Sequence, residues 1–571
     1  MTSLSLPLKG SLTQTSPAIS RSRFRLCLAI GAAVGAVIAL WALAPQYILG
    51  STGKWAHPEN DLNPYLISWY YYIADQWRLP LFSLPAMGYP EGGNVLFNDG
   101  LPLTAIVTKA LYKLSGLQIN PFGWWGLAVY VLQGMMAARL VCAFGVRSML
   151  AAVGAAVLAI CYMPFLYRLG HVALSSHFLI LWALALYVEC SRERKLKSIE
   201  IGVLMLVAIL VNSYQFVMVS VIVGATVIQG IELGSIRRAD LVFLSVGAAI
   251  VAAAALISGY GVFVTTPDTM KASGFGFFSW NVGTLVVPPE ALWHFPRHFV
   301  RDATGGQYEG ESYVGLGALL LAVVCVVARP AWVRASVRRH AVLMLALTGL
   351  AVWAASNRVY FGRIPLLVYY LPRRVEAYSN YFRASGRFIW PLAYSIGVMS
   401  LAMVWRWFKP GVAVALTLLA IALQFREARP TLRVVQVYTA STHADMIQSD
   451  RLAPWLETHA RVWQYPSWSC GGLAGPKREW GNDEANRELQ LELLIARRGL
   501  PTNSVYTSRQ LKNCHEEAAW GDNPKLAPGV LYLIGRNTPF PPALVALSAS
   551  SSCVNLDWVT ACSRSWGKPS D

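Results

Sequence analysis

Two acidic residues separated by a single position, Glu59 and Asp61, follow the first long apolar stretch of the chain. A carboxylate at this place can take a proton from an attacking hydroxyl group, which is the task of a general base. Arginines elsewhere in the chain, Arg168 and the pair Arg383 and Arg387, can hold a phosphate group through paired hydrogen bonds from the planar guanidinium. The sequence therefore contains the side chains for a proton transfer beside a bound phosphate.

The composition indicates where these residues must act. Of the 571 residues, 55% are hydrophobic and only 14% are charged, and the mean hydropathy is +0.43. These values are typical of a polytopic membrane protein, in which about 20 apolar residues cross the hydrocarbon core as a helix. Such stretches predict about 11 transmembrane helices. They lie near 25–49, 122–144, 148–166, 172–190, 199–212, 214–232, 240–264, 313–328, 341–357, 387–406 and 411–425.

The basic residues predict the orientation, because short cytoplasmic loops retain Lys and Arg. They cluster at the N-terminus and in every second connection, which places the tail 1–24 in the cytoplasm. The loops 50–121, 265–312 and 358–386 then lie on the outer side. Within the first of these loops, the apolar stretch 101–117 contains Lys109 and Lys113, and we expect it to lie in the outer interface rather than to span.

The region after the last span is expected to be a soluble periplasmic domain, 426–571, with α+β structure. Its four cysteines, Cys470, Cys514, Cys553 and Cys562, predict two disulfides in an oxidising compartment, with all three pairings open. The alternative, four free thiols in a cytoplasmic tail, requires an even number of spans. An apolar run at 529–534 predicts a buried strand, and the pattern near 484–497 predicts an amphipathic helix.

Charge and the N-terminal sequence exclude two other interpretations. The net charge of +18 does not indicate a nucleic-acid partner, because the soluble tail has sixteen basic and fourteen acidic residues and the excess lies in the membrane part. The first apolar stretch is too long for a signal peptide and is not followed by a small-residue cleavage pattern. We expect it to be retained as the first span.

Several outer-loop residues have both a functional and a structural interpretation. The aromatic cluster 69–72 suits sugar stacking and also an ordinary aromatic belt at the membrane surface. His171 and His177 are either site residues or buried structural histidines. Arg383 and Arg387, four residues apart on one predicted helical face, either bind a phosphate or anchor the helix at the interface.

Several motifs in combination carry a resemblance to a known family. The triplet 59–61 after the first span, the segment Asn98 to Leu103 and the segment Arg168 to His171 occur with Gly305 to Gly310 and Phe382 to Phe388. Over residues 25–425 this arrangement resembles the GT-C superfamily of integral membrane glycosyltransferases, and within it a bacterial branch of largely uncharacterised members. The expected fold is an all-α, GT-C-like polytopic membrane domain followed by the extracytoplasmic α+β domain.

The resemblance implies a reaction. Asp61 would be the general base, or would position one, with Glu59 in support. The donor would be a sugar on a polyprenyl phosphate, used by an inverting enzyme on the extracytoplasmic face of a bacterial inner membrane. The acceptor would be a glycan, a lipid or a protein of the cell envelope.

The resemblance also implies roles for other residues. Arg383, Arg387, Arg168 and His171 would bind the phosphate and lipid of the donor. The substrate loops would contribute Asp99, Gln307, Tyr308 and Glu309. The glycine-rich aromatic run 273–281 is expected to pack on the prenyl chain, and the polar run 305–311 is expected to be a flexible cover over the site.

A divalent cation is possible but undecided, and no other cofactor is expected. Only Glu59, Asp61, Asp99 and Glu309 would offer the hard oxygen ligands that such a cation needs. Two rival functions remain open from the sequence. A transporter or flippase of lipid-linked sugars would also be polytopic with outer arginines, but more often has ionisable residues at mid-span. A structural assembly subunit would leave the loop residues unexplained.

Overall fold

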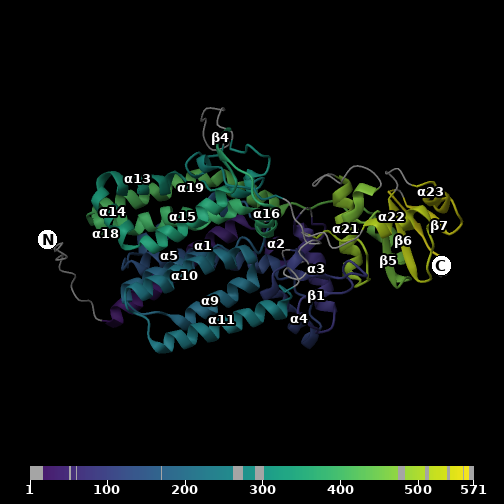
Figure 1. The fold of residues 1–571 in the computed structure, drawn as a ribbon, viewed down its shortest axis with the longest axis horizontal. Coiled ribbons are helices and arrows are strands. Elements are labelled where there is room, and N and C mark those ends of the chain that lie inside the picture. Colours follow the sequence, from purple (N-terminus) through teal and green to yellow (C-terminus); the bar gives the residue numbers. More distant parts are fainter. Residues whose placement is uncertain are drawn as a thin grey trace.

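The computed structural model describes residues 17–50, 53–58, 61–98, 100–168, 170–261, 274–289, 301–473, 483–507, 514–535, 541–556 and 558–564. Glu59 and Asp99 lie outside this part of the chain. The molecule is elongated, with a helical bundle at one end and a small domain of helices and strands at the other (Figure 1). The loop that carries Asp61 lies between them.

Each of the predicted apolar stretches contains a helix in the described part of the chain. The bundle helices are α1 (Pro17–Ala42), α5 (Phe122–Ala143), α6 (Met149–Ile160), α8 (Phe178–Glu193), α9 (Ser198–Val211), α10 (Ser213–Glu232), α11 (Arg238–Ser258), α13 (Leu316–Ala328), α15 (Ala341–Ala355), α17 (Trp390–Tyr394), α18 (Ser400–Trp407) and α19 (Pro410–Ala440). The turns η6 (Ser385–Ile389) and η7 (Ser395–Met399) join α17 and α18 into one helical segment.

The number of spans stays a prediction. In the described chain, six helices are long and apolar enough to cross a membrane, or seven if the bent pair α13 and α14 (Pro330–Arg339) is one span. That pair bends by 101°, so α14 turns sharply away from the axis of α13. The helices α6, α9 and α15 have 12, 14 and 15 residues. At about 1.5 Å per residue, these are shorter than the thickness of a hydrocarbon core.

Small residues let the first two long helices pack closely. A side-chain carbon added to Gly31 would lie 2.4 Å from the carbonyl oxygen of Gly134, and one added to Gly134 would lie 2.2 Å from that of Gly31. Helices in lipid associate through such close backbone contacts, because burial of apolar surface gives them no advantage over lipid. The pair α1 and α5 therefore forms a fixed core for the bundle.

The last helix of the bundle is longer than the sequence predicts. The apolar stretch was expected to end near residue 425, but α19 continues to Ala440. Ala428, Leu432, Val435 and Thr439 are buried at helical spacing, so the inward-facing stripe continues beyond the predicted apolar stretch.

The first connecting loop is largely helical. It contains α2 (Pro45–Leu49), η1 (Gly53–Trp55), α3 (Leu62–Ala74), β1 (Ser83–Leu84), β2 (Gly93–Asn94), η2 (Val95–Asn98) and α4 (Pro102–Ser115). The helix α4 occupies the stretch expected to lie in the interface. Its lysines turn toward α3, where Lys109 donates to the carbonyl of Gln76 and lies 4.1 Å from the ring centroid of Tyr72.

The later loops are shorter and turn-rich. They contain α7 (Met163–Leu166), η3 (Val282–Leu285), η4 (Gln307–Gly310), the antiparallel hairpin of β3 (Arg358–Phe361) and β4 (Ile364–Val368), α16 (Arg373–Ser379) and η5 (Asn380–Phe382). In Figure 1 the hairpin lies at the edge of the bundle, on the side away from α11.

The C-terminal domain is an α+β unit, as predicted. Its four-stranded sheet has the order β5, β6, β8, β7, with β5 and β6 parallel and the remaining pairs antiparallel. The predicted strand and helix are confirmed as β6 and α21. The elements are α20 (Ser449–Glu457), β5 (Arg461–Tyr465), η8 (Trp468–Leu473), α21 (Asp483–Arg497), α22 (Cys514–Asp522), β6 (Val530–Gly535), α23 (Pro542–Ser548), β7 (Cys553–Leu556) and β8 (Val559–Cys562).

The four cysteines of this domain form the two predicted disulfides. The pairs are Cys470 with Cys514, whose Cα atoms are 5.5 Å apart, and Cys553 with Cys562, whose Cα atoms are 4.0 Å apart. The second bond joins residues that face each other on β7 and β8. The pairing that the sequence left open is therefore decided by the order of the strands.

Candidate active site

Asp61 begins the helix α3, with its carboxylate facing a histidine. The carboxylate does not cap its own helix. Its Oδ2 instead lies 3.4 Å from Nε2 of His171, and the side chain of Asp61 is 32% exposed. A carboxylate at a helix N-terminus is favoured by the positive end of the helix dipole. Asp61 is thus ionisable, partly open to solvent and held beside a second proton-binding group.

A buried cluster of two arginines and one glutamate lies next to this pair. Glu309 accepts two hydrogen bonds from Arg387, at 3.0 and 2.9 Å, and its Oε2 lies 2.7 Å from a guanidinium nitrogen of Arg168. Arg168 also donates to the backbone carbonyl of Glu309 at 3.1 Å. All three residues are buried. One carboxylate therefore bridges two guanidinium groups, which we call the Arg–Glu–Arg cluster.

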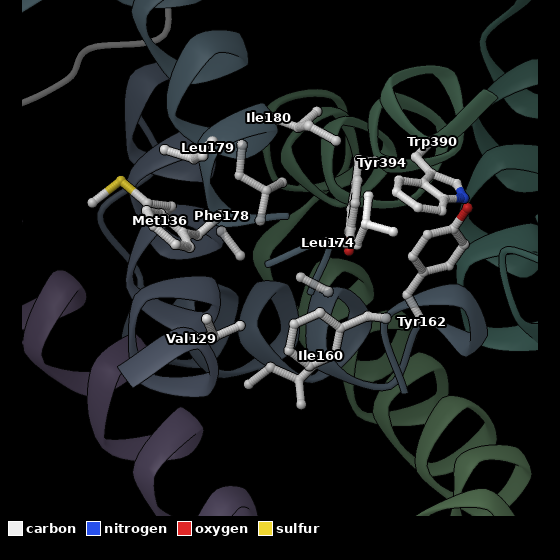
Figure 2. Close-up of a cluster of buried hydrophobic side chains, with 14 of the residues drawn as sticks. Val129, Met136, Ile160, Tyr162, Leu174, Phe178, Leu179, Ile180, Trp390 and Tyr394 are labelled. Atoms are coloured by element: carbon white, nitrogen blue, oxygen red, sulfur yellow. The ribbon is translucent and has the colours of Figure 1, made fainter. Parts of the chain in front are cut away.

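Aromatic rings cover both arginines. The guanidinium of Arg168 lies 5.4 Å from the ring of Trp390, and that of Arg387 lies 4.7 Å from the ring of Tyr214. Both rings are at the face-to-cation distance at which the ring quadrupole attracts a cation. Figure 2 shows Trp390 beside Tyr162 and Tyr394 at the edge of a packed apolar cluster. The stacked rings therefore restrict the positions of both guanidinium groups.

Two glycines allow the loops that carry the cluster to meet. A side-chain carbon on Gly386 would lie 2.5 Å from Cα of Gly310, and one on Gly310 would lie 2.7 Å from the backbone oxygen of Ser279. Because no larger residue fits at this crossing, Glu309 and Arg387 come within hydrogen-bonding distance although 78 positions separate them. The backbone N–H of Gly386 also donates to the carbonyl of Phe278.

The charges of the cluster affect the neighbouring side chains. Burial favours a raised pKa for Glu309, but the charges of Arg168 and Arg387 outweigh it and hold the pKa of this carboxyl well below its usual range. Burial, followed by the charges of Glu309 and Asp61, raises the pKa of the Tyr308 phenol. Asp61 and the cluster therefore belong to one electrostatic site.

Arg383 differs from the two buried arginines. No carboxylate among the described residues pairs with it, and its guanidinium lies 5.5 Å from the ring of Phe278. The three arginines Arg168, Arg383 and Arg387 give a formal charge of +3, and the carboxylates of Glu309 and Asp61 reduce it to +1 for these five described side chains. The site therefore has a net positive charge that suits an anionic ligand.

The two arginines predicted to share a helical face do not do so. Arg383 follows η5, whereas Arg387 lies inside η6, and Ala384 between them has a non-helical backbone. The prediction of one continuous helix from the spacing of four was wrong. A turn between two short helices directs Arg383 to Phe278 and Arg387 to Glu309.

Other predicted site residues have structural contacts. Gln307 is buried and its amide bonds to Asn281, Ser279 and the backbone of Ala303. His177 is buried, lies 2.9 Å from the hydroxyl of Tyr394 and packs 4.2 Å from the Trp390 ring. These contacts match the interpretation of His177 as a structural histidine.

The polar run 305–311 is folded in the structure, and its role as a flexible cover stays a prediction. Asp302 accepts hydrogen bonds from the backbone N–H groups of Thr304, Gly305 and Tyr308, and Arg301 pairs with Glu311 at 2.6 Å. The run is thus folded into a tight turn that carries the buried Glu309. Of its side chains, Tyr308 is the one with a large exposed fraction, at 60%.

The described residues do not fit a divalent cation. No group of three His, Cys, Asp or Glu side chains converges in the part of the chain that the structure describes. Glu309, one of the four predicted oxygen ligands, is bound to two arginines, whose positive charges oppose a cation. Asp61 faces His171, and Glu59 and Asp99 lie outside the described residues.

The C-terminal domain holds the segment that precedes Asp61. Arg497 donates to the backbone carbonyls of Trp55 and Ala56, at 3.3 and 3.1 Å. The hydroxyl of Tyr71 on α3 donates to the carbonyl of Leu500 at 2.7 Å. The domain is thus joined to both sides of Asp61, so its position affects the position of the carboxylate.

Sequence analysis did not recognise that aromatic and amide residues support the arginines, although it singled out the run 273–281, which contains Phe278 and Asn281. Tyr214, Phe278 and Trp390 lie on the three guanidinium groups, and Asn281 connects the loops. They come from three separate segments of the chain, so spacing along the chain did not indicate that they meet. The available hint was compositional, because aromatic residues are concentrated in the same loops as the arginines.

Comparisons with known proteins give one family. The sequence matches the family described as "Domain of unknown function (DUF6311)" over residues 32–429, and "DUF6311 C-terminal domain" over residues 451–564. A comparison with curated proteins found no match.

Three solved structures are similar at low identity. Arabinofuranosyltransferase AftD from Mycobacteria has 14% identity and a TM-score of 0.47, and the match covers 93% of this chain and 39% of that one. Archaeal oligosaccharyltransferase AglB from Archaeoglobus fulgidus has 11% identity and a TM-score of 0.46, over 89% and 69%. An Archaeoglobus fulgidus oligosaccharyltransferase tethered to an acceptor peptide has 13% identity and a TM-score of 0.43, over 91% and 69%. This chain spans 39% of the length of the mycobacterial enzyme. The likeness is distant, so function has to be argued from this chain's own residues.

Proposed function

This chain belongs to the DUF6311 family, and we propose that it is a membrane glycosyltransferase that moves a sugar from a polyprenyl phosphate to an acceptor hydroxyl on the extracytoplasmic face. The observation that carries the proposal is the pairing of a partly exposed carboxylate, Asp61, with an adjacent site of net positive charge. A base and a cationic phosphate site are the two requirements of this transfer. The resemblance of the outer-loop motifs to GT-C enzymes supports the same reaction.

The proposed reaction is a single displacement with inversion. The acceptor oxygen attacks the anomeric carbon of the sugar, and the bond from that carbon to the phosphate oxygen breaks. Asp61 accepts the proton of the acceptor hydroxyl, and His171, 3.4 Å away, holds the carboxylate in place. The electron pair of the broken bond leaves with the polyprenyl phosphate.

The arginines have separate tasks in this proposal. Arg387 and Arg168 are engaged by Glu309 and maintain the positive potential from a buried position. Arg383 has no carboxylate partner among the described residues and is half-buried on Phe278, so it is the arginine that can bind the departing phosphate directly. The exposed ring of Tyr308 lies next to Phe278 and offers a surface for the sugar.

The charge distribution and the disulfides support the extracytoplasmic orientation in this proposal. Both disulfides lie in the C-terminal domain, and such bonds persist in oxidising compartments. The domain contacts the Asp61 segment directly, so both belong on the extracytoplasmic side. Single cysteines placed at Ser51 and Ser570 test this. Both should react with a membrane-impermeant reagent in intact spheroplasts, and a position that reacts only after lysis contradicts the orientation.

The function itself is tested with the purified full chain in lipid nanodiscs. A polyprenyl phosphate carrying a radiolabelled sugar is supplied with a pool of envelope glycans and lipids. The proposal expects the label to move into an acceptor and free polyprenyl phosphate to appear. Transbilayer movement of the donor in proteoliposomes, with no new glycosidic bond, would instead identify a transporter and refute the proposal.

A further inference from the structure

The β3–β4 hairpin has an exposed apolar surface that the proposed reaction does not use. The seven consecutive residues from Ile364 to Tyr370 are all exposed, and every one is apolar, aromatic or proline. Leu366, Leu367 and Val368 are 58%, 55% and 54% exposed, and Tyr370 is 98% exposed. Because neighbouring strand residues point to opposite faces, β4 is apolar and exposed on both faces, whereas Val359 and Tyr360 in β3 are half-buried.

Such a hairpin is not suited to water. A two-stranded hairpin is at best marginally stable there by itself, and a contiguous exposed apolar patch marks a surface that binds a partner or a membrane. In the described part of the chain, neither strand belongs to a larger sheet, and a single bridge from Tyr360 to Asn281 is the other strand contact. None of the described residues therefore covers the exposed residues of β4.

The apolar surface continues from a bundle helix. Val352 and Trp353, on the last turn of α15, are 66% and 40% exposed, and the hairpin begins five residues later. In Figure 1 the hairpin lies beside the bundle, away from the C-terminal domain. The exposed face of a membrane helix contacts lipid, so the same lipid environment extends onto the hairpin.

The open strand edge and the charged side chains of the hairpin indicate how deeply it lies in the lipid. An open strand edge is not tolerated in hydrocarbon, where nothing satisfies its polar groups. Four arginines and one acidic residue lie between positions 358 and 378, giving a local charge of +3. In the described chain, no carboxylate pairs with Arg363, Arg373 or Arg374. Tyrosines and arginines together suit the headgroup region and favour anionic lipid.

We propose that the β3–β4 hairpin docks into the interface of the adjacent membrane leaflet and binds anionic lipid headgroups through the arginines of 358–374. This surface has a direct connection to the site. The N–H of Gly362, in the hairpin turn, donates to Asn281 at 3.0 Å, and Asn281 donates to Gln307 at 3.1 Å. Gln307 lies two residues before Glu309. Lipid contact at the hairpin is thereby transmitted to the turn that carries the Arg–Glu–Arg cluster.

The test places a fluorescent label on the full chain in nanodiscs. Cysteines are introduced singly at Leu366, at Tyr370 and, as a matched control, at Val545 on α23, which is 52% exposed. Quenching is measured with spin-labelled lipids and with a water-soluble quencher. The proposal expects at least a threefold stronger lipid-borne quenching at the hairpin positions than at Val545, and the reverse order with the aqueous quencher.

Two outcomes would overturn the proposal. Hairpin labels that respond like the Val545 label show that the hairpin is in water. Labels protected from both quenchers, in a chain that migrates as a dimer, show that a second copy covers the hairpin. The headgroup preference is tested by replacing Arg363, Arg373 and Arg374 with Gln. The label at Tyr370 should respond to added phosphatidylglycerol in the parent chain and lose this response in the triple variant, and an unchanged response refutes the anionic preference.

Discussion

Two ion clusters of the bundle, one partly buried and one fully buried, both join basic side chains to glutamates but differ in charge balance. At the end away from Asp61, Arg139 on α5 bonds Glu189 at 3.0 and 2.8 Å and Glu200 at 2.5 Å, and Lys197 bonds Glu189 at 2.7 Å. The charges of these two basic and two acidic side chains sum to zero. In the Arg–Glu–Arg cluster, one carboxylate serves two arginines, and Arg383 adds a further charge nearby.

The difference separates a structural ion cluster from a binding site. A balanced cluster satisfies its own charges and has no electrostatic need for a ligand. An unbalanced one keeps a positive potential in a poorly solvated place, where its attraction for an anion is strong. Ring stacking and close backbone contacts maintain that imbalance. The following predictions, from the largest expected effect to the smallest, test this comparison.

Removing the charge of Glu309 should have the largest effect on stability. In Glu309→Gln two buried arginines lose their carboxylate, and breaking a buried ion pair by removing one partner costs about 3–5 kcal/mol. Glu189→Gln is the matched control, because Glu200 remains to pair with Arg139. Thermal unfolding of both variants in detergent measures the difference. Equal losses would show that the two clusters do not differ as described.

The pH dependence of this loss is fixed by the depressed pKa of Glu309. A carboxyl whose pKa is lower in the folded state stabilises the protein above its unfolded pKa, about 4.3, and this contribution is lost as the pH falls toward the folded value. The stability of the wild type should therefore approach that of Glu309→Gln below about pH 4. A constant difference between the two down to pH 2 would contradict the assignment.

Asp61→Asn should lower transfer by about 100-fold or more, because an amide cannot accept the proton of the acceptor hydroxyl. The fold and the abundance should be unchanged, since the side chain of Asp61 is partly exposed and does not cap its helix. Glu200→Gln, in the balanced cluster, is expected to retain near-normal turnover. The initial rate of label transfer decides the outcome, and near-normal turnover of Asp61→Asn would remove this residue from the mechanism.

Arg383→Lys should raise the apparent donor KM by about tenfold while leaving the acceptor KM unchanged. Lysine keeps the charge but loses the planar fork, and about one charged hydrogen bond is lost. Arg498→Lys, in the C-terminal domain, is the control, because its described contacts are with Glu457 and the Leu494 carbonyl and do not involve the site. An unchanged donor KM in Arg383→Lys would refute the phosphate role. Arg387→Lys is less informative, because it also disrupts the pair with Glu309.

Arg497→Ala should have the smallest effect, a loss of about threefold in kcat at unchanged donor KM. The variant loses one contact between the C-terminal domain and the segment before Asp61, and a hydrogen bond of this kind contributes about 0.5–1.5 kcal/mol. The neighbouring Arg498→Ala removes a bond within the C-terminal domain and should not alter kcat. Equal kcat values for the two variants would show that the domain does not position the carboxylate.

The sequence by itself determined the helices, the α+β domain and the existence of two disulfides. These features depend on hydropathy, local periodicity and residue counts, which can be read along the chain. It also identified Asp61, Arg168, Arg383 and Arg387 as chemically capable residues. It did not find the length of α19, since that helix is held by contacts with other helices after its own hydropathy has fallen.

Only the tertiary structure decided which of these residues meet. The pairing of Glu309 with Arg168 and Arg387 joins positions separated by 141 and 78 residues and requires two glycines at one crossing. Equal spacing gave Arg383 and Arg387 the same predicted role, but the turn between them leaves Arg383 half-buried on Phe278 and Arg387 buried and paired with Glu309. Long-range contacts and local backbone geometry set the charge balance of the site, and neither is encoded in residue spacing alone.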